Sequence, residues 1–188
     1  MVARPGESRL TPRLFLVAPA AHEPHLAACL KAACEAGDVA SLLTLHADLI
    51  PIAQGLGVAA LTPEPNSKAD GIHVDAAGVA AARLAMGPDA IVGAFVGSSR
   101  HFAMEAAEAG ADYVALSQKG ASLGGEPIVK WCAEFLEIPC VAFDPASVSD
   151  LDILLPQKPD FIRPLDAMWD DPESARRIIT ELMQRLTA

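Results

Sequence analysis

The stretch ADGIHVD, residues 69–75, begins a repeating pattern that continues with GPDAIVGAFV at 87–96 and AEAGADYV at 107–114. Each stretch leads through glycine, proline or aspartate into a short apolar run, which is typical of a buried strand. Runs with helical composition, 77–86 and 98–109, lie between them. This strand–helix–strand order predicts parallel strands joined by right-handed crossovers.

The same alternation extends over the whole chain. Strands are predicted at residues 13–19, 39–45, 57–61, 71–74, 90–96, 112–116, 138–143 and 160–162. Helices are predicted at residues 24–36, 48–54, 77–86, 98–109, 126–137, 147–155 and 171–186. Eight strands in this order predict a compact (β/α)8 TIM barrel, with residues 1–188 as one domain. The alternative is an open doubly wound sheet, but no G-x-G-x-x-G follows the first strand, so its dinucleotide-binding form has no support.

The connection between the third and fourth predicted strands is unusually short. Only about seven residues join them, and they include PEPNSK at 63–68. Parallel neighbours usually need a crossover of a dozen residues or more. Because prolines and turn-forming residues disfavour a helix here, we expect an extended crossover and a thin place in the outer ring.

Composition excludes several classes of protein. The net charge is −10 with only 14 Lys and Arg, which disfavours a nucleic-acid partner. No run of about 18 apolar residues predicts a membrane span, and no signal-peptide core precedes the first strand. We therefore expect a cytoplasmic protein with no membrane partner. Its four cysteines form no C-x-x-C pair and are expected to be reduced, buried thiols. A homodimer remains an open alternative.

Sites in barrels of this kind form at the C-terminal ends of the strands. The candidates for binding a small molecule there are His46, His73, Asp75, Ser117, Gln118, Lys119, Asp144, Arg163 and Asp166. This mouth is acidic, with Lys119 and Arg163 as its main cations, so it suits a cation, an amine or a metal better than a diphosphate. Asp48, Ser98 and Ser99 are instead expected to cap helices.

Some candidates also have a structural interpretation. His73 lies inside a strand and fits a hydrogen-bonded structural histidine. Asp144 and Asp166 precede no predicted helix directly, which favours a functional role, and Arg163 could pair with one of them. A metal site made of His46, His73, Asp75 and Asp144 is a further alternative that the spacing does not require, so we assign no metal ligand.

The central segment resembles the thiamine phosphate synthase family, which includes a thiazole tautomerase branch. That family has A-D-G-V-H, a helix, G-x-x-x-I-[IV]-G-x-S, a helix and E-A-G-A-D-Y-V in the order found here at residues 69–114. The resemblance implies a barrel that joins a pyrimidine diphosphate to a thiazole phosphate and releases pyrophosphate. It also implies strand-end residues that hold Mg²⁺ and both phosphate groups.

The second to fifth strands depart from the family pattern at the diphosphate and metal positions. Leu42–His46 replaces Q-L-R-x-K, and Leu61–Pro63 replaces a strand end with N-D. The Asp of V-H-x-G-Q-x-D falls on Ala77 or Gly78, although Asp75 lies nearby, and Phe95 replaces the serine of G-x-S.

The last three strands also depart from the pattern. Ser117–Gly120 replaces the T-x-T-K loop, where Lys119 alone could stand in, and Ala142–Pro145 replaces the A-I-G-G phosphate cradle. Leu165-Asp166 replaces V-S. The tautomerase branch has a histidine after the sixth strand, where this chain has Ser117 and Gln118.

Loss of one preorganised donor typically lowers a rate about 10²–10³-fold, so we expect the synthase activity to be lost. The main hypothesis is a family barrel that binds another small ligand or acts as a regulator. One alternative is an active synthase-type transferase in thiamine biosynthesis with a rearranged site, and only then would Mg²⁺ be a cofactor. Another is a non-catalytic scaffold or interaction subunit.

Overall fold

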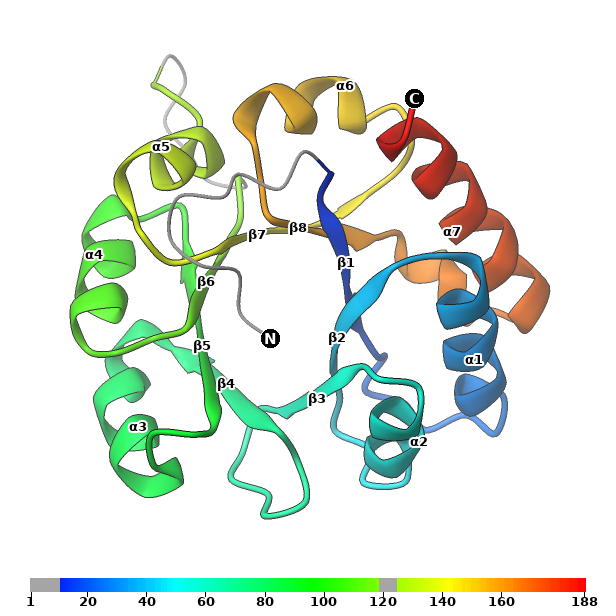
Figure 1. Cartoon of the computed structure of the whole chain (residues 1–188), viewed down its shortest axis with the longest axis horizontal. Coiled ribbons are helices and arrows are strands. Elements are labelled where there is room, and N and C mark those ends of the chain that lie inside the picture. Colours follow the sequence, from blue (N-terminus) through cyan, green and yellow to red (C-terminus); the bar gives the residue numbers. More distant parts are fainter. Residues whose placement is uncertain (1–10, 119–124) are drawn as a thin grey trace.

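The computed structural model, which describes residues 11–118 and 125–188, contains a closed barrel of eight parallel strands in chain order (Figure 1). The predicted TIM barrel is therefore confirmed, and the open sheet is wrong. The strands are β1 Arg13–Val17, β2 Val39–Leu43, β3 Ala59–Thr62, β4 Gly71–Asp75, β5 Ile91–Gly97, β6 Tyr113–Leu116, β7 Cys140–Ala146 and β8 Phe161–Pro164.

The helices cover the outside of the barrel (Figure 1). The α-helices of the described part are α1 Leu26–Ala36, α2 Leu49–Gly55, α3 Val79–Met86, α4 Arg100–Glu108, α5 Ile128–Phe135, α6 Leu151–Leu154 and α7 Pro172–Leu186. Three short 3₁₀ helices join them: η1 Ala76–Gly78, η2 Leu155–Gln157 and η3 Asp166–Trp169. Helices α1 and α7 pack side by side, because the last helix closes the ring against the first (Figure 1).

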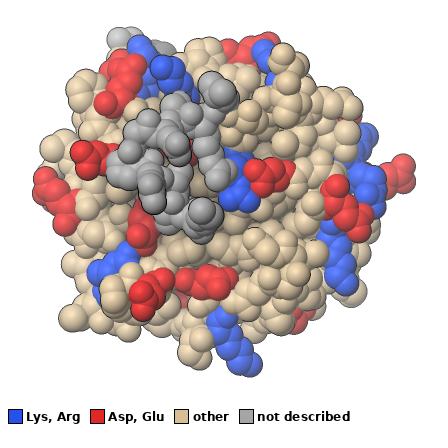
Figure 2. All heavy atoms as spheres, viewed as in Figure 1, with Lys and Arg blue, Asp and Glu red and all other residues tan. Residues whose placement is uncertain are grey.

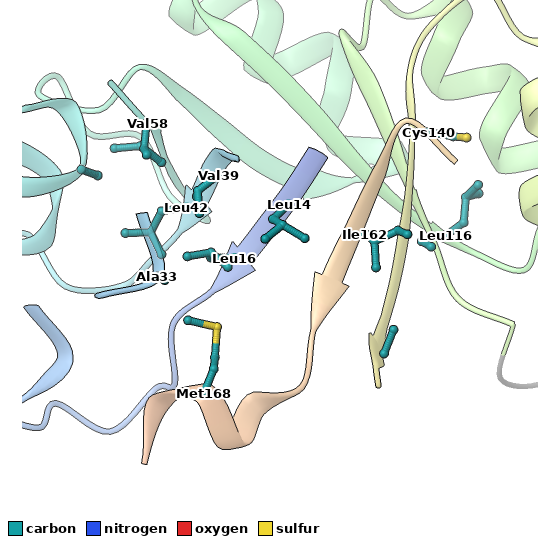
Figure 3. Packing of buried hydrophobic residues seen from close by; sticks show 14 of the residues in the cluster. Leu14, Leu16, Ala33, Val39, Leu42, Val58, Leu116, Cys140, Ile162 and Met168 are labelled. Carbon is teal, nitrogen blue, oxygen red and sulfur yellow. The ribbon is translucent and has the colours of Figure 1, made fainter. Parts of the chain in front are cut away.

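The main hydrophobic core lies between the barrel wall and this outer layer. Leu14 and Leu16 of β1 are fully buried, and they belong to the same cluster as Ala33 of α1 and Met168 of η3 (Figure 3). Alternate residues of the strand, such as Phe15, belong to a second cluster. Because burial of one leucine side chain contributes about 1.5–3 kcal/mol, this two-sided burial explains why the strands read as continuous apolar runs.

No helix lies between β3 and β4, and all the residues of this connection are described, so the predicted extended crossover is confirmed. The loop is visible at the bottom of Figure 1 as a bare excursion from the barrel wall. The two strands pair only at Leu61–Gly71 and Thr62–Ile72. An open groove of about 820 Å³ runs between the loop and the end of α3, with Asn66 and Met86 among its lining residues.

Several predicted element boundaries were wrong. Helix α1 begins at Leu26 rather than at residue 24, and α5 occupies Ile128–Phe135 rather than residues 126–137. Strand β7 is longer than predicted and includes Asp144 and Pro145. Asp166 lies in the first turn of η3, contrary to the expectation that no helix follows it.

The predicted helix caps were partly right. The Ser99 hydroxyl accepts a hydrogen bond from the Phe102 amide at the start of α4, as expected for a cap. Asp48 is wrong as a side-chain cap, because its carboxylate contacts His22 Nε2 at 3.2 Å and makes no capping hydrogen bond to α2. An aspartate in helical backbone conformation turns its side chain away from the first amides of the helix, which explains this outcome.

The described helices include none long and apolar enough to cross a lipid bilayer. Cys29, Cys132 and Cys140 are buried, and Cys34 is partly buried. Burial raises the pKa of the Cys34 thiol to about 11 and that of Cys132 to about 12. All four cysteines are free, as predicted.

Candidate functional site

The interior of the barrel is built from side chains that lie level with one another on neighbouring strands. His73 of β4 pairs in register with Gly93 of β5, and Gly93 pairs with Tyr113 of β6. Gly93 has no side chain, and a Cβ at this position would overlap the Tyr113 ring. The tyrosine ring therefore crosses β5 and reaches the histidine two strands away.

His73 forms the centre of this interior layer. Its Nδ1 lies 2.7 Å from the Tyr113 hydroxyl, and the side chain is buried. Burial lowers the pKa of His73 to about 4, because desolvation disfavours the charged imidazolium. Burial also raises the pKa of Tyr113. Both groups are therefore neutral at pH 7, and the predicted hydrogen-bonded histidine is confirmed.

Phe143 lies between this interior layer and the side chains at the C-terminal ends of the strands. Its ring stacks on His73 at a centroid distance of 5.4 Å and an interplanar angle of 13°. It also contacts Phe95 at 5.6 Å, and the Arg163 guanidinium carbon lies 5.3 Å from its centroid. The mouth therefore has an aromatic wall, to which Phe95 contributes a ring that is 40% exposed.

Arg163 is the cation that the described residues place at this wall. Its Nη2 donates to Asp166 Oδ1 at 2.6 Å, and Nη1 makes a long contact of 3.4 Å to the Phe143 carbonyl. The expected pairing of Arg163 with one of the two aspartates is thus confirmed. Its Nε is a buried donor with no hydrogen-bond partner among the described residues. Unsatisfied buried donors are rare in folded proteins and need a reason.

Asp144, Ser117 and Gln118 are all predicted site residues, and the structure uses Asp144 to link the ends of β6 and β7. One carboxylate oxygen accepts from the Ser117 hydroxyl and the other from the Gln118 amide, both at 2.8 Å. The side chain of Gln118 donates in turn to Gln157. A cavity of about 210 Å³ beside this link is lined by Leu116, Gln118, Val129, Ala142, Phe143, Asp144, Pro145, Ala146, Asp150, Ile153 and Leu154.

The other candidate residues do not join a common site. His46 Nε2 contacts the Pro19 carbonyl at 2.7 Å, and Asp75 accepts from the Gly78 amide as the cap of η1. Lys119 lies outside the described residues. No three histidine, cysteine or acidic side chains of the described residues gather as a metal-binding group. The alternative metal site of His46, His73, Asp75 and Asp144 is therefore wrong, because each has a separate structural partner.

Sequence reasoning missed the aromatic part of the site. Tyr113 and Gly93 are not among the candidates predicted from the sequence, and Phe95 and Phe143 appear there only at positions that replace family residues. A signal was present, because a glycine on the strand between a histidine strand and a tyrosine strand leaves room for their contact. Detecting it requires the register of three strands, which becomes certain only when the barrel closes.

Comparisons with known proteins show which proteins this chain is similar to. A family model described as "Thiamine monophosphate synthase" matches residues 25–144. The thiamine-phosphate synthase of Rhodospirillum centenum is 35% identical over 187 residues, covering 85% of this chain and 90% of that protein. The corresponding protein of Erythrobacter litoralis is 34% identical and covers 80% of this chain and 69% of that protein.

Solved structures show the same fold at low sequence identity. Thiamine phosphate pyrophosphorylase from Pyrococcus furiosus has a TM-score of 0.73 and 19% identity, covering 93% of this chain and 95% of that one. Tryptophan synthase of Mycobacterium tuberculosis has a TM-score of 0.70 with 14% identity, covering 95% of this chain and 94% of that one. These likenesses support the barrel fold alone.

Proposed function

Because the chain belongs to the thiamine monophosphate synthase family, we propose that it is a synthase-type transferase of thiamine biosynthesis whose barrel mouth has been rearranged. This reverses the order of the two hypotheses drawn from the sequence. The match to named synthases runs over most of both chains, whereas the expected loss of activity rests on strand-end substitutions alone. Both hypotheses assume the family fold with a ligand pocket at the mouth of the barrel.

The position of Arg163 at the barrel mouth is the observation that supports this proposal. It stands on β8 beside Phe143, with 17% of its side chain exposed and its Nε without a described partner. A guanidinium offers donors in a fixed planar fork that suits phosphate oxygens. Asp166, which is 60% exposed, now holds Nη2. An incoming phosphate would compete with this carboxylate for the donors of Nη2.

Aromatic rings on the same wall provide the second element of the site. The substrates that the family resemblance implies, a pyrimidine diphosphate and a thiazole phosphate, each join a flat ring to an anionic group. Phe143 and Phe95 offer ring faces, and Arg163 offers charge next to them. Among the described residues no three histidine, cysteine or acidic side chains gather as a metal-binding group, so no residue is assigned as a ligand of Mg²⁺.

The test is a direct assay with the pyrimidine diphosphate and the thiazole phosphate, in the presence and in the absence of Mg²⁺. Release of pyrophosphate and formation of the joined product are measured together. We expect turnover above the enzyme-free background, and a loss of roughly 10²-fold or more in Arg163→Gln. Arg176→Gln is the matched control, because Arg176 pairs with Glu35 on the outer surface. Turnover equal in all three proteins would refute the role of Arg163.

A second candidate function is ligand binding without turnover. Asp144 and Asp166 favour it, because these carboxylates stand where the family resemblance implies anion-binding groups, and like charges repel. The same assay separates the two candidates. Saturable binding of either substrate in calorimetry, with no product formed, would support ligand binding without turnover. Absence of both binding and turnover would contradict both candidates.

A further inference from the structure

The contact between His73 and Tyr113 is unusually well defined for two residues on strands that do not pair directly. The Tyr113 hydroxyl lies 2.7 Å from His73 Nδ1, and the two rings stack at 5.7 Å with an angle of 26°. Phe143 stacks on His73 at 5.4 Å, and Phe15 contacts the Tyr113 ring at 5.5 Å. The imidazole is thus fixed by one hydrogen bond and by ring contacts.

The direction of the hydrogen bond follows from the needs of the tyrosine. Its hydroxyl is buried, and His73 is its one side-chain partner among the described residues. A buried O–H without an acceptor costs about 1–3 kcal/mol, whereas a hydroxyl oxygen with spare lone pairs costs less. Tyr113 therefore donates to Nδ1. A neutral imidazole that accepts at Nδ1 carries its proton on Nε2.

The proton on Nε2 is then the second hydrogen-bonding group of the imidazole. No described residue accepts a hydrogen bond from it, and it does not belong to the fully buried unsatisfied atoms of the described residues, which consist of Arg163 Nε alone. His73 Nε2 therefore keeps some contact with solvent, in line with the 8% exposure of the residue. The imidazole adjoins the aromatic wall, since Phe143 contacts both His73 and Phe95.

We propose that Tyr113 is a positioning residue that holds His73 as the neutral imidazole with its proton on Nε2, and that this N–H binds an acceptor nitrogen of a flat heteroaromatic ring. The proposal rests on the proposed function for the place of the ligand, and it deepens that function by naming the donor that selects the ring. Gly93 belongs to the same arrangement, because it leaves the space through which Tyr113 reaches His73.

The first experiment needs no substrate. Long-range ¹H–¹⁵N correlation spectra of the ligand-free protein distinguish a protonated from an unprotonated ring nitrogen, and His73→Gln assigns the signal. We expect a pyrrole-type Nε2 and a pyridine-type Nδ1 in the wild type at pH 7. In Tyr113→Phe we expect a mixture of the two tautomers. A wild-type spectrum with the proton on Nδ1 overturns the proposal, whether or not the protein turns over substrate.

The second experiment tests the choice of ligand with two probes of similar shape. Aminopyrimidine has ring nitrogens that accept hydrogen bonds, and aniline has none. We expect the wild type to bind aminopyrimidine up to about tenfold more tightly, as one net hydrogen bond allows, and Tyr113→Phe to lose this preference. Equal affinity of the wild type for the two probes overturns the ligand part of the proposal.

Thr44→Val is the matched control for Tyr113→Phe. It also removes one buried hydroxyl, which accepts from the His46 amide rather than touching His73. We expect it to keep both the tautomer and the preference for aminopyrimidine. A control that loses them equally shows a general effect of destabilisation and overturns the assigned role of Tyr113. If Tyr113→Phe does not fold, the wild-type spectrum alone still decides the tautomer.

Discussion

Arg83 near the end of α3 donates from Nη2 to the carboxylate of Asp112, which directly precedes β6, over 2.5 Å. The same guanidinium donates to the carbonyls of Gly87, Ala90 and Gly110. Asp112 also accepts from the Val92 amide. One half-buried side chain thus bridges the loops that lead into β5 and β6.

Most other acidic and basic side chains on the visible face of the molecule lie around its rim (Figure 2).

We expect Arg83→Met to lower the free energy of unfolding by about 2–3 kcal/mol, because it leaves several carbonyls and a carboxylate without their donor. Urea denaturation followed by circular dichroism measures the change. Arg100→Met is the control, since the side chain of Arg100 is 45% exposed and its ion pair with Glu126 lies at the surface. That variant should stay within about 0.5 kcal/mol of the wild type. Equal losses in the two variants would contradict the bridging role.

Gly93→Ala should lower the free energy of unfolding, although it adds only one methyl group. The new Cβ would overlap the Tyr113 ring, so the ring or the strand has to move, and overpacking of this kind typically costs about 1–3 kcal/mol. Gly55→Ala is the matched control in α2, where an added Cβ meets nothing within 4 Å. A helix-terminal alanine there should be neutral or slightly stabilising.

The clash at Gly93 can also be tested by rescue. Tyr113→Leu removes the ring that the new methyl group would strike. In a double-mutant cycle, Gly93→Ala should therefore cost less in the Tyr113→Leu background than in the wild type, by about 1 kcal/mol or more. Strictly additive losses would show that the glycine serves some purpose other than making room for the tyrosine.

Stability should depend on His73 at mildly acidic pH. Its pKa of about 4 in the folded protein is below the ordinary value of 6.5, because of burial. Between these two pH values the histidine therefore binds a proton in the unfolded chain but not in the folded protein. This contribution is fully present above pH 6.5 and is lost as the pH falls towards 4, by at most roughly 3 kcal/mol.

The measurement compares urea unfolding of the wild type and of His73→Phe between pH 4 and pH 7. Asp48, Asp150 and Asp171, whose pKa values are lowered by hydrogen bonds from His22, Ser147 and Ser174 respectively, are common to both proteins and cancel in the difference. The wild type should lose stability more steeply as the pH falls. Parallel curves would show that His73 titrates normally.

The thiols should react slowly in the native protein at pH 7. Three are buried, and even the partly buried Cys34 has its pKa raised to about 11 by desolvation and by Glu35, so the reactive thiolate is scarce. A disulfide reagent such as dithionitrobenzoate should label all four cysteines in urea and label Cys34 first without it. Rapid native labelling of Cys140 would contradict the buried core around β7.

The barrel could be predicted from the sequence because its main determinants are local. Runs such as Ile91–Val96 between Pro88 and the Ser98–Ser99 pair show strand and turn signals within a few residues. The missing helix after β3 followed from the length and the prolines of 63–68 in the same way. Boundaries were less certain, because β7 extends past Asp144 and Pro145 only through the pairing of Ala146 with Pro164, which follows a register shift.

The candidate site was only partly predictable. The pairing of Arg163 with one of the two aspartates was found correctly, whereas the link between Ser117 and Asp144 was not foreseen. The roles of these residues depend on which partner lies opposite, and this is set by strand register across the barrel. Asp144 illustrates the limit, since its isolated carboxylate suggested a functional group whereas two donors from the end of β6 already satisfy it.

The short pairing of β3 with β4 also has a consequence for how the molecule fluctuates. Two residue pairs and no covering helix hold these strands together, whereas β4 and β5 pair over five. Local opening of a fold starts where buried contacts are fewest. Amide hydrogens of Leu61 and Thr62 should therefore exchange with deuterium ahead of those in β5. Local opening of the barrel is therefore expected first on the side where Asn66 and Met86 line the open groove.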